Sequence, residues 1–416
     1  MILDLFLDKL IMRIIFIIIS LVLFYYYFVY RNKLDIFTLA FLCCEFYFMP
    51  GWFGFTTRVY DDRTREFVKC SDTLYYVFLI TIIFLFIFTL ISDKKLVLPQ
   101  IESSKNIDIT LMTNICSFIL IVILILFITV NGEDVFGKSK LEYIGNIGVI
   151  YQILRYLIPI VFLFAVINKN IIAYLTSSVG IIIDLYMSNR TVSLICIVIF
   201  VLFYIYNNDK KHIYTYKKYL IIILLICISF LVFERIIEPI QKKDWTEVNR
   251  RIANVDTYVD SIIVSEPFVT QTILEEVIQK NYKVKENTIT SYFYKNRSTF
   301  NDNFQSDLFP KITRYKMAEN IWAEAYANYD FLGILIMSFI YSLNIFILNI
   351  LILKLKNSIY TPYIYILSAN WIFFLHRGSV VNQLTRQKNI LLVFGSCLLA
   401  AYIFNIARKR LSLWKK

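Results

Sequence analysis

Residues that carry much of soluble-enzyme chemistry are scarce in this chain, which has two histidines, ten glycines and seven cysteines among 416 residues. It contains no Gly-rich nucleotide loop, Walker sequence, HExxH or DxD pair, so a nucleotide-driven or zinc-dependent mechanism has no support. The cysteines show neither CxxC nor Cys/His spacing, and only Cys70 lies outside an apolar run, which leaves no disulfide framework. We therefore expect no cofactor and no metal site.

Charge is also sparse, at 18% of residues, whereas apolar residues make up 58% and gather in repeated runs of about twenty. Such runs cross a membrane as helices, because inside hydrocarbon each backbone amide must be hydrogen-bonded within the chain. The sequence predicts an all-α polytopic membrane protein with about eleven transmembrane helices. The expected spans are residues 11–30, 36–55, 73–91, 109–130, 147–167, 171–187, 191–206, 219–233, 331–353, 362–376 and 389–407.

The basic residues are distributed unevenly between the two sides of these spans. The short segments on the side of the C-terminal tail carry seventeen Lys and Arg against five Asp and Glu, whereas the opposite short loops carry ten against seven. The positive-inside rule then places the C-terminus in the cytoplasm and the N-terminus outside. This asymmetry accounts for the net charge of +12, so it implies no nucleic-acid partner.

One long stretch, residues 234–329, is polar, and we call it the polar segment. It carries thirteen Lys and Arg against fourteen Asp and Glu and many aromatic residues, which is typical of a folded domain. The chain thus divides into helices 1–8 in residues 1–233, the polar segment outside the cytoplasm, and helices 9–11 with a tail in residues 330–416.

Within the polar segment, the apolar spacing of Glu266–Lys280 predicts an amphipathic helix. Residues Asn296–Pro310 are polar and rich in Asn, and indicate irregular chain. Helical propensity returns from Thr313 to Asn328 and runs into the next span. This last stretch is expected to bring carboxylates back to the membrane surface.

Three charged residues, Glu45, Arg155 and Asp184, fall inside predicted spans. An unpaired charge there costs roughly 2.5–3.5 kcal/mol on insertion scales, so each needs a partner. A structural ion pair between Arg155 and Asp184 is one explanation, and a protonated packing role explains Glu45.

The predicted topology puts several of these groups at the same end of the helices. Arg155 and Asp184 belong to the outer half of the membrane, where Arg190, His376 and Arg377 also lie. His376, alone, also fits an ordinary interfacial histidine. Guanidinium groups match phosphate oxygens bidentately, carboxylates accept protons from sugar hydroxyls, and aromatic faces pack on pyranose rings. A lipid-linked sugar pyrophosphate would use all three.

Three short segments resemble O-antigen polymerases of the Wzy type. The sequence Ser-Asn-Arg190-Thr191 is similar to the Ser-x-Arg-Thr hairpin of that family. The stretch from Glu324 through Tyr326 and Asn328 to Gly333 is similar to its Glu-x-Tyr-x-Asn-Phe-Gly-x-x-Gly stretch, although Asp330-Phe331 interrupts the pattern. Residues 377–382 resemble a short Arg-Gly segment found late in such proteins.

The resemblance covers roughly residues 150–390 and implies a GT-C-like glycosyltransferase of the bacterial inner membrane. Such a polymerase takes a glycan on undecaprenyl pyrophosphate, on the periplasmic face, and transfers it to the non-reducing end of another lipid-linked repeat unit. The pyrophosphate linkage supplies the energy. The resemblance also implies a chain-length-regulating co-polymerase as a partner, besides the lipid bilayer.

Candidate site residues follow from the spans and from the resemblance. For the general base, Glu324 ranks first because it lies two residues before Tyr326 at the entry to a span, and Glu319, His376 and Asp61 follow. The residues expected to bind pyrophosphate or other parts of the substrate are Arg155, Asp184, Arg190, Arg314, Tyr326, Asn328 and Arg377.

Three other functions stay open. An O-antigen ligase shares the topology and donor, but that family has a functional His in its large loop, and residues 234–329 contain none. A lipid-linked-oligosaccharide flippase would use Arg155 and Asp184 in a central cavity, although no matched inverted halves are visible. A different lipid-dependent transferase would place its carboxylates at Asp61 and Asp62.

Overall fold

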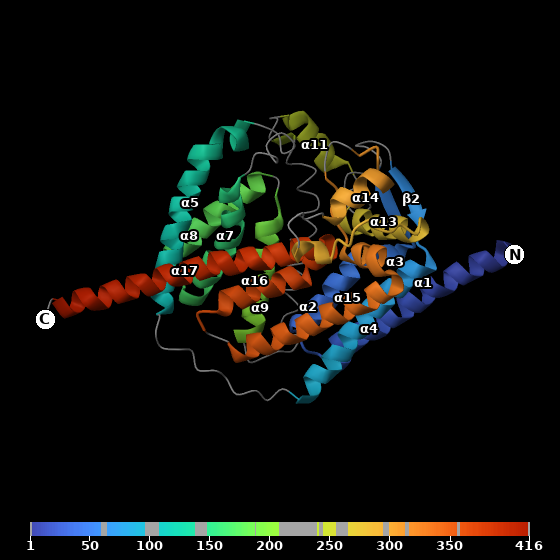
Figure 1. The fold of residues 1–416 in the computed structure, drawn as a ribbon, viewed down its shortest axis with the longest axis horizontal. Coiled ribbons are helices and arrows are strands. Elements are labelled where there is room, and N and C mark those ends of the chain that lie inside the picture. Colours follow the sequence, from blue (N-terminus) through green and yellow to red (C-terminus); the bar gives the residue numbers. More distant parts are fainter. Residues whose placement is uncertain are drawn as a thin grey trace.

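The computed structural model shows a chain built mainly of long apolar helices, with its two ends at opposite extremes of the molecule (Figure 1). Within the part of the chain that the structure describes, six helices are long and apolar enough to cross a membrane, in agreement with a helical, polytopic membrane protein. The structure describes residues 2–59, 65–95, 108–137, 148–187, 189–207, 239–240, 244–254, 265–293, 299–312, 316–355 and 358–414.

Each of the six long helices coincides with a predicted span. They lie in α1 with its π-helical end η1 (Ile2–Tyr25, Tyr26–Tyr30), α4 (Asp72–Lys95), α5 (Ile109–Gly137), α7 (Val149–Asn168), α15 (Ile321–Lys354) and α17 (Val380–Trp414).

Four predicted spans correspond to shorter helices, and one is not described. The shorter ones are α2 (Ile36–Tyr47), α8 (Ile171–Tyr186), α9 (Thr191–Asn207) and α16 (Thr361–Ile372), the last followed by the 3-10 turn η3 (Phe374–Arg377). The predicted span at 219–233 lies outside the described residues.

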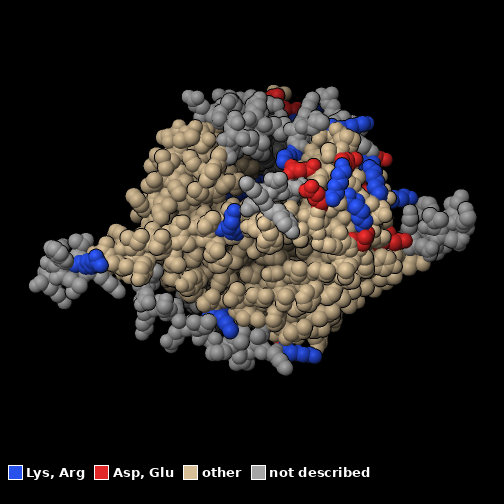
Figure 2. Space-filling view, viewed as in Figure 1, with Lys and Arg blue, Asp and Glu red and all other residues tan. Residues whose placement is uncertain are grey.

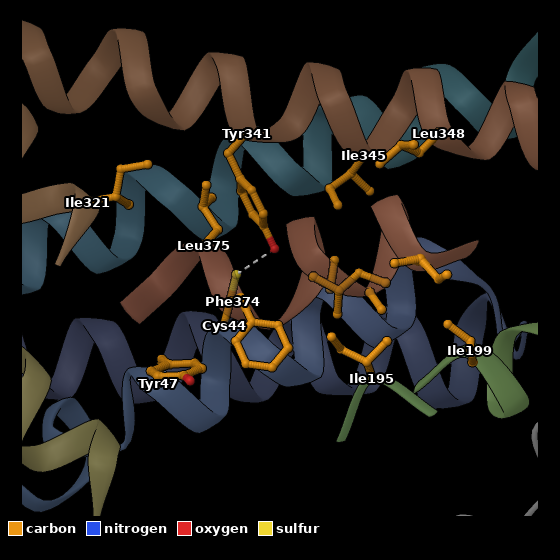
Figure 3. Packing of buried hydrophobic residues seen from close by; sticks show 14 of the residues in the cluster. Cys44, Tyr47, Ile195, Ile199, Ile321, Tyr341, Ile345, Leu348, Phe374 and Leu375 are labelled. Carbon is orange, nitrogen blue, oxygen red and sulfur yellow. Dashed lines mark hydrogen bonds between the residues drawn. The ribbon is translucent and has the colours of Figure 1, made fainter. Parts of the chain in front are cut away.

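Two helical groups meet around a shared core. Helix α15 packs against α4 and α16, while α7 packs against α5, α8 and α9 (Figure 1). Between the groups, Cys44 of α2 donates to the hydroxyl of Tyr341 of α15 at 3.5 Å, and Ile195 of α9 and Phe374 of η3 lie close by (Figure 3). Residues from α2, α9, α15 and η3 therefore share one buried cluster.

At the far end of α1, a buried ion pair joins three helices. Arg31 contacts Asp35 and Asp93, each at 2.6 Å, and Asp35 also caps α2 by accepting from the backbone N–H groups of Phe37 and Thr38. Burial alone would raise the pKa of Asp35, but the Arg31 guanidinium outweighs burial and holds that pKa below its usual value.

The outer loop predicted at residues 56–72 contains a β-hairpin that was not predicted from the sequence. Strands β1 (Phe55–Val59) and β2 (Arg65–Lys69) form an antiparallel hairpin with Phe55 opposite Lys69. The hairpin packs on the polar segment, where Phe55 contacts Phe268 and Arg58 pairs with Glu276. Contacts with α13, far away in the sequence, thus stabilise two strands that the local sequence does not predict.

The polar segment contains short helices covered by charged side chains, whereas the flanks of the long helices are apolar (Figure 2). Its elements include α11 (Trp245–Ala253), α13 (Glu266–Gln279), the turn η2 (Thr290–Phe293) and α14 (Phe300–Leu308), with the short helix α3 (Met49–Phe53) packed beneath α13. The helix predicted at Glu266–Lys280 is confirmed as α13, but it is not amphipathic, because residues Thr270–Val277 are buried on every face.

Helix α14 corrects the prediction of irregular chain over Asn296–Pro310. Thr299 and Asp302 form a capping box, in which each side chain bonds the other residue's backbone N–H. Phe300 and Phe304, one turn apart, are buried and stack with ring centroids 4.8 Å apart. The capping box and the two buried rings stabilise a helix here despite the polar composition of the segment.

Helix α15 begins at Ile321, later than the helical stretch predicted from Thr313. Asn320 caps it by accepting from the backbone N–H groups of Trp322 and Ala323. The helix is kinked at Tyr329–Asp330, where Asp330 adopts a positive φ of 53°. The kink brings Gly333 so close to Ala325 that a Cβ at 333 would overlap the carbonyl oxygen of Ala325.

We predict that Gly333→Ala lowers stability by about 1–3 kcal/mol, because overpacking against fixed backbone forces the kink apart. Gly395→Ala in α17 is the matched control, since a Cβ there meets nothing within 4 Å. Thermal unfolding of the two purified variants in detergent measures the difference. Equal melting temperatures for the two variants would show that the kink does not need glycine.

Candidate functional site

The backbone between α16 and α17 is broken next to the polar segment. Helix α16 ends at Ile372, η3 turns through Phe374–Arg377, and α17 begins at Val380. Residues 377–388, expected as a loop, are therefore mostly helix, which is a correction to the predicted span at 389–407. The first turns of α17 carry a row of polar side chains at this end of the bundle.

Three arginines from separate elements meet at this break, and we call Arg155, Arg377 and Arg386 the arginine cluster. The guanidinium carbons of Arg377 and Arg386 lie 5.9 and 5.2 Å from the centre of the same Phe374 ring. Arg386 of α17 interacts electrostatically with Arg377 and with Arg155 of α7. Arg377 also pairs with Glu266 at the start of α13, with Nη1 to Oε2 at 2.8 Å.

Arg155 and Asp184 both bond the start of α9. Arg155 donates to the hydroxyl of Thr191 at 3.2 Å. Asp184 accepts from the hydroxyl of Tyr151 at 2.6 Å and from the backbone N–H of Val192 at 3.3 Å. Asp184 therefore joins α7, α8 and α9, while Arg155 makes its own bond to the first residue of α9.

Arg190 lies beside the cluster. Its charge and that of Arg377 both act on the hydroxyl of Tyr47, as does the charge of Glu266. That hydroxyl is buried and has no hydrogen-bond partner among the described residues. The predicted residues Arg155, Arg190 and Arg377 are thus brought to one region.

His376 is fully buried in an aromatic setting, not at an interface. Trp322 donates from Nε1 to its Nδ1 at 3.3 Å, and the ring stacks on Tyr47 with centroids 4.9 Å apart. Since an indole N–H only donates, Nδ1 is an acceptor and the imidazole is neutral. Its other nitrogen faces Cys44 Sγ at 3.8 Å, so the ring serves packing.

Glu324 is fully buried and has both carboxylate oxygens bonded. Oε2 accepts from the backbone N–H of Val380 at 2.6 Å, and Oε1 accepts from the hydroxyl of Thr288 at 2.8 Å. Asn328 bonds the same Thr288 through its side chain. Glu324 and Asn328 thus join α15, the polar segment and the first turn of α17.

Glu319 is buried on the side of the arginine cluster. One oxygen accepts from the backbone N–H of Asn301 at 3.0 Å, and the other contacts the side chain of Asn382. Its charge also acts on Arg386. One oxygen of Glu319 thus contacts a side-chain amide near a guanidinium, whereas Glu324 bonds the backbone of α17 and Thr288.

The other predicted site residues lie apart from the cluster or are not described. Tyr326 has its ring beneath Lys283, whose Nζ is 4.9 Å from the ring centre. Arg314 and Asp61 lie outside the described residues. Glu266, Gln383 and Arg386 were missed, although the spacing of residues 383, 386 and 387 would place them on one helical face.

The face between α7 and α17 holds buried polar atoms that the described protein does not satisfy. They are Nε of Arg155, both amide atoms of Gln383 and Nε2 of Gln387. Leaving such a group without a partner costs about 1–3 kcal/mol, and more when it is charged. These unsatisfied atoms lie on the two helices that carry Arg155 and Arg386, so the region suits an anion that also carries polar groups.

Comparisons of the chain with protein-family models, with curated proteins and with solved structures give no match.

Proposed function

We propose that this protein is a glycosyltransferase that uses a polyprenyl-pyrophosphate-linked glycan and joins repeat units into a surface polysaccharide. The observation that carries the proposal is the arginine cluster, which lies where apolar helices meet the polar segment. A lipid-linked substrate has its pyrophosphate at such a boundary, with its tail among lipids and its sugars in water.

The charges near the cluster favour a strongly anionic ligand. Glu266 offsets one charge by pairing with Arg377, and Arg190 adds another positive charge nearby. Arginine forks match the paired oxygens of phosphate groups, and the low local dielectric strengthens each contact. A pyrophosphate would balance the remaining charge better than a single carboxylate.

For the general base, the geometry favours Glu319 over Glu324. Attack by a sugar hydroxyl needs an acceptor for its proton near the leaving pyrophosphate. Glu319 acts electrostatically on Arg386, and one of its oxygens contacts only the side chain of Asn382 among the described residues. Glu324 is held by backbone and by Thr288, and its bonds maintain the start of α17.

The proposal extends to the architecture and location. It includes eleven spans, a GT-C-like arrangement, and the bacterial inner membrane with the N-terminus and the polar segment in the periplasm. Undecaprenyl pyrophosphate is the proposed carrier, and a chain-length co-polymerase is the proposed partner. The uneven distribution of basic residues supports the orientation.

We predict that a phosphatase reporter fused after Lys280 is active and that one fused after Lys416 is inactive, because the first lies in the periplasm and the second in the cytoplasm. A fluorescent reporter that matures only in the cytoplasm should give the reverse pattern. An active phosphatase after Lys416 would overturn the orientation.

We predict that Arg377→Lys and Arg386→Lys each reduce long polymer about tenfold or more, because an ammonium group cannot reproduce two parallel charge-assisted hydrogen bonds. Polymer ladders on gels, at matched expression, provide the measurement. Arg250→Lys is the control, since this exposed arginine pairs with Glu247 within α11. Full ladders from both cluster variants would remove phosphate binding from the proposal.

The two carboxylates provide a third prediction. Glu319→Gln should reduce polymer by about 10²–10⁴-fold and leave cells with single repeat units, because the base is lost. Glu324→Gln should keep polymer, since an amide can accept from Val380 N–H and donate to Thr288. The opposite pattern would return Glu324 to the role of base. Loss of all surface glycan would instead indicate a flippase or a ligase.

A further inference from the structure

Gln383 is the least expected side chain at this end of α17. It is 3% exposed, and within the part of the chain that the structure describes neither its amide oxygen nor its amide nitrogen has a hydrogen-bond partner. The same holds for the amide nitrogen of Gln387, one turn further along. Buried amides without partners oppose folding, so these positions are costly unless a ligand supplies the missing bonds.

The two glutamines lie on the same helical face as Arg386, because residues 383, 386 and 387 are related by steps of three and four. Helix α17 packs against α7, and Arg386 interacts with Arg155 of that helix. Asn382, next to Gln383, holds the proposed base Glu319. The amides therefore lie on the same two turns of α17 as Arg386 of the arginine cluster and Asn382, which contacts the proposed base.

The chemistry of an amide separates two kinds of ligand. Phosphate oxygens only accept hydrogen bonds, so they suit guanidinium groups but are repelled by the oxygen of a glutamine. A sugar hydroxyl or an acetamido group both donates and accepts, and it can satisfy both ends of Gln383. A neutral polar group beside an anion is what a sugar phosphate presents.

We propose that Gln383, with Gln387, binds a hydroxyl or acetamido group of the sugar attached directly to the pyrophosphate, and so selects the first sugar of the donor. This inference rests on the proposed function and deepens it. Arg155 and Arg386 bind the anionic part, while the glutamines recognise the pyranose. The specificity of the protein for its glycan then resides partly in the first two turns of α17.

The test uses the full chain in detergent and measures binding of two lipids. One is undecaprenyl pyrophosphate, and the other is the lipid-linked glycan isolated from cells that lack this protein. Gln383→Leu should bind the bare lipid as the wild type does and the glycan-bearing lipid about tenfold more weakly, because only the sugar contacts are lost. Its melting temperature should be unchanged or higher, since no internal bond is removed.

Gln305→Leu serves as the matched control. Gln305 of α14 donates to the carbonyl of Ile312 at 2.9 Å and accepts from the backbone N–H of Met317 at 3.0 Å. Its removal should lower the melting temperature and leave the binding of both lipids unchanged. The melting temperature and the lipid binding together thus distinguish a glutamine that stabilises the fold from one that binds a ligand.

Four results would overturn the inference. Equal weakening for both lipids would assign Gln383 to the anion, and a lowered melting temperature with unchanged binding would assign it to ordered water within the fold. Failure of the wild-type protein to bind the bare lipid would remove the proposed function itself. A further result would keep the proposed function and remove only the sugar contact. In that case Arg386→Ala abolishes binding of the bare lipid, whereas Gln383→Leu changes the binding of neither lipid.

Discussion

A charged side chain among apolar helices needs a partner, and this requirement is the constraint on which the structure depends. Several of the polar groups that hold helices together have such partners. Arg31 pairs with Asp35, and Tyr151 donates to Asp184. Among the described residues, Arg155 Nε on α7 and the amide of Gln383 on α17 have none. Under the proposed function, a ligand would complete these groups.

Breaks in helical backbone accompany that site. In a membrane, irregular backbone persists where protein buries it or where it lines a cavity. Helix α15 is kinked at Tyr329–Asp330, and η3 interrupts the path from α16 to α17. The carboxylate of Glu324 spans the two breaks, because it lies before the kink and accepts from the first N–H of α17. One buried carboxylate thus fixes the relative positions of two discontinuous helices.

The sequence predicted what local pattern determines. The long apolar runs predicted the six long helices. The apolar spacing of Glu266–Lys280 predicted α13, whose ends differ from the prediction by one residue. It missed β1 and β2 because their partners lie on α13, some two hundred residues away. The function and the membrane orientation stay predictions.

The candidate site was predictable only in part. In-span charges pointed to Arg155 and, with the outer loops, to Arg377. Arg386 and Gln383 were taken for loop residues, because the apolar run that signals α17 begins after the helix itself. An apolar run shows where a helix is hydrophobic but not where the helix begins. Polar residues in the first turns of α17 were therefore assigned to a loop. The roles of Glu319 and Glu324 depend on contacts with Asn382 and Val380 that no linear pattern contains.

The brevity of α16 has a consequence for substrate access. Its twelve residues rise about 18 Å, whereas the hydrocarbon core is about 30 Å thick. The turn η3 adds roughly 2 Å per residue, so a path from Thr361 at one boundary of the core brings Arg377 close to the opposite boundary. Under the proposed function, the headgroup of a lipid-linked substrate would then meet Arg377 at its own depth while its tail stays among the lipids. The length of the attached glycan would not affect that entry, because the sugars would project away from the bilayer.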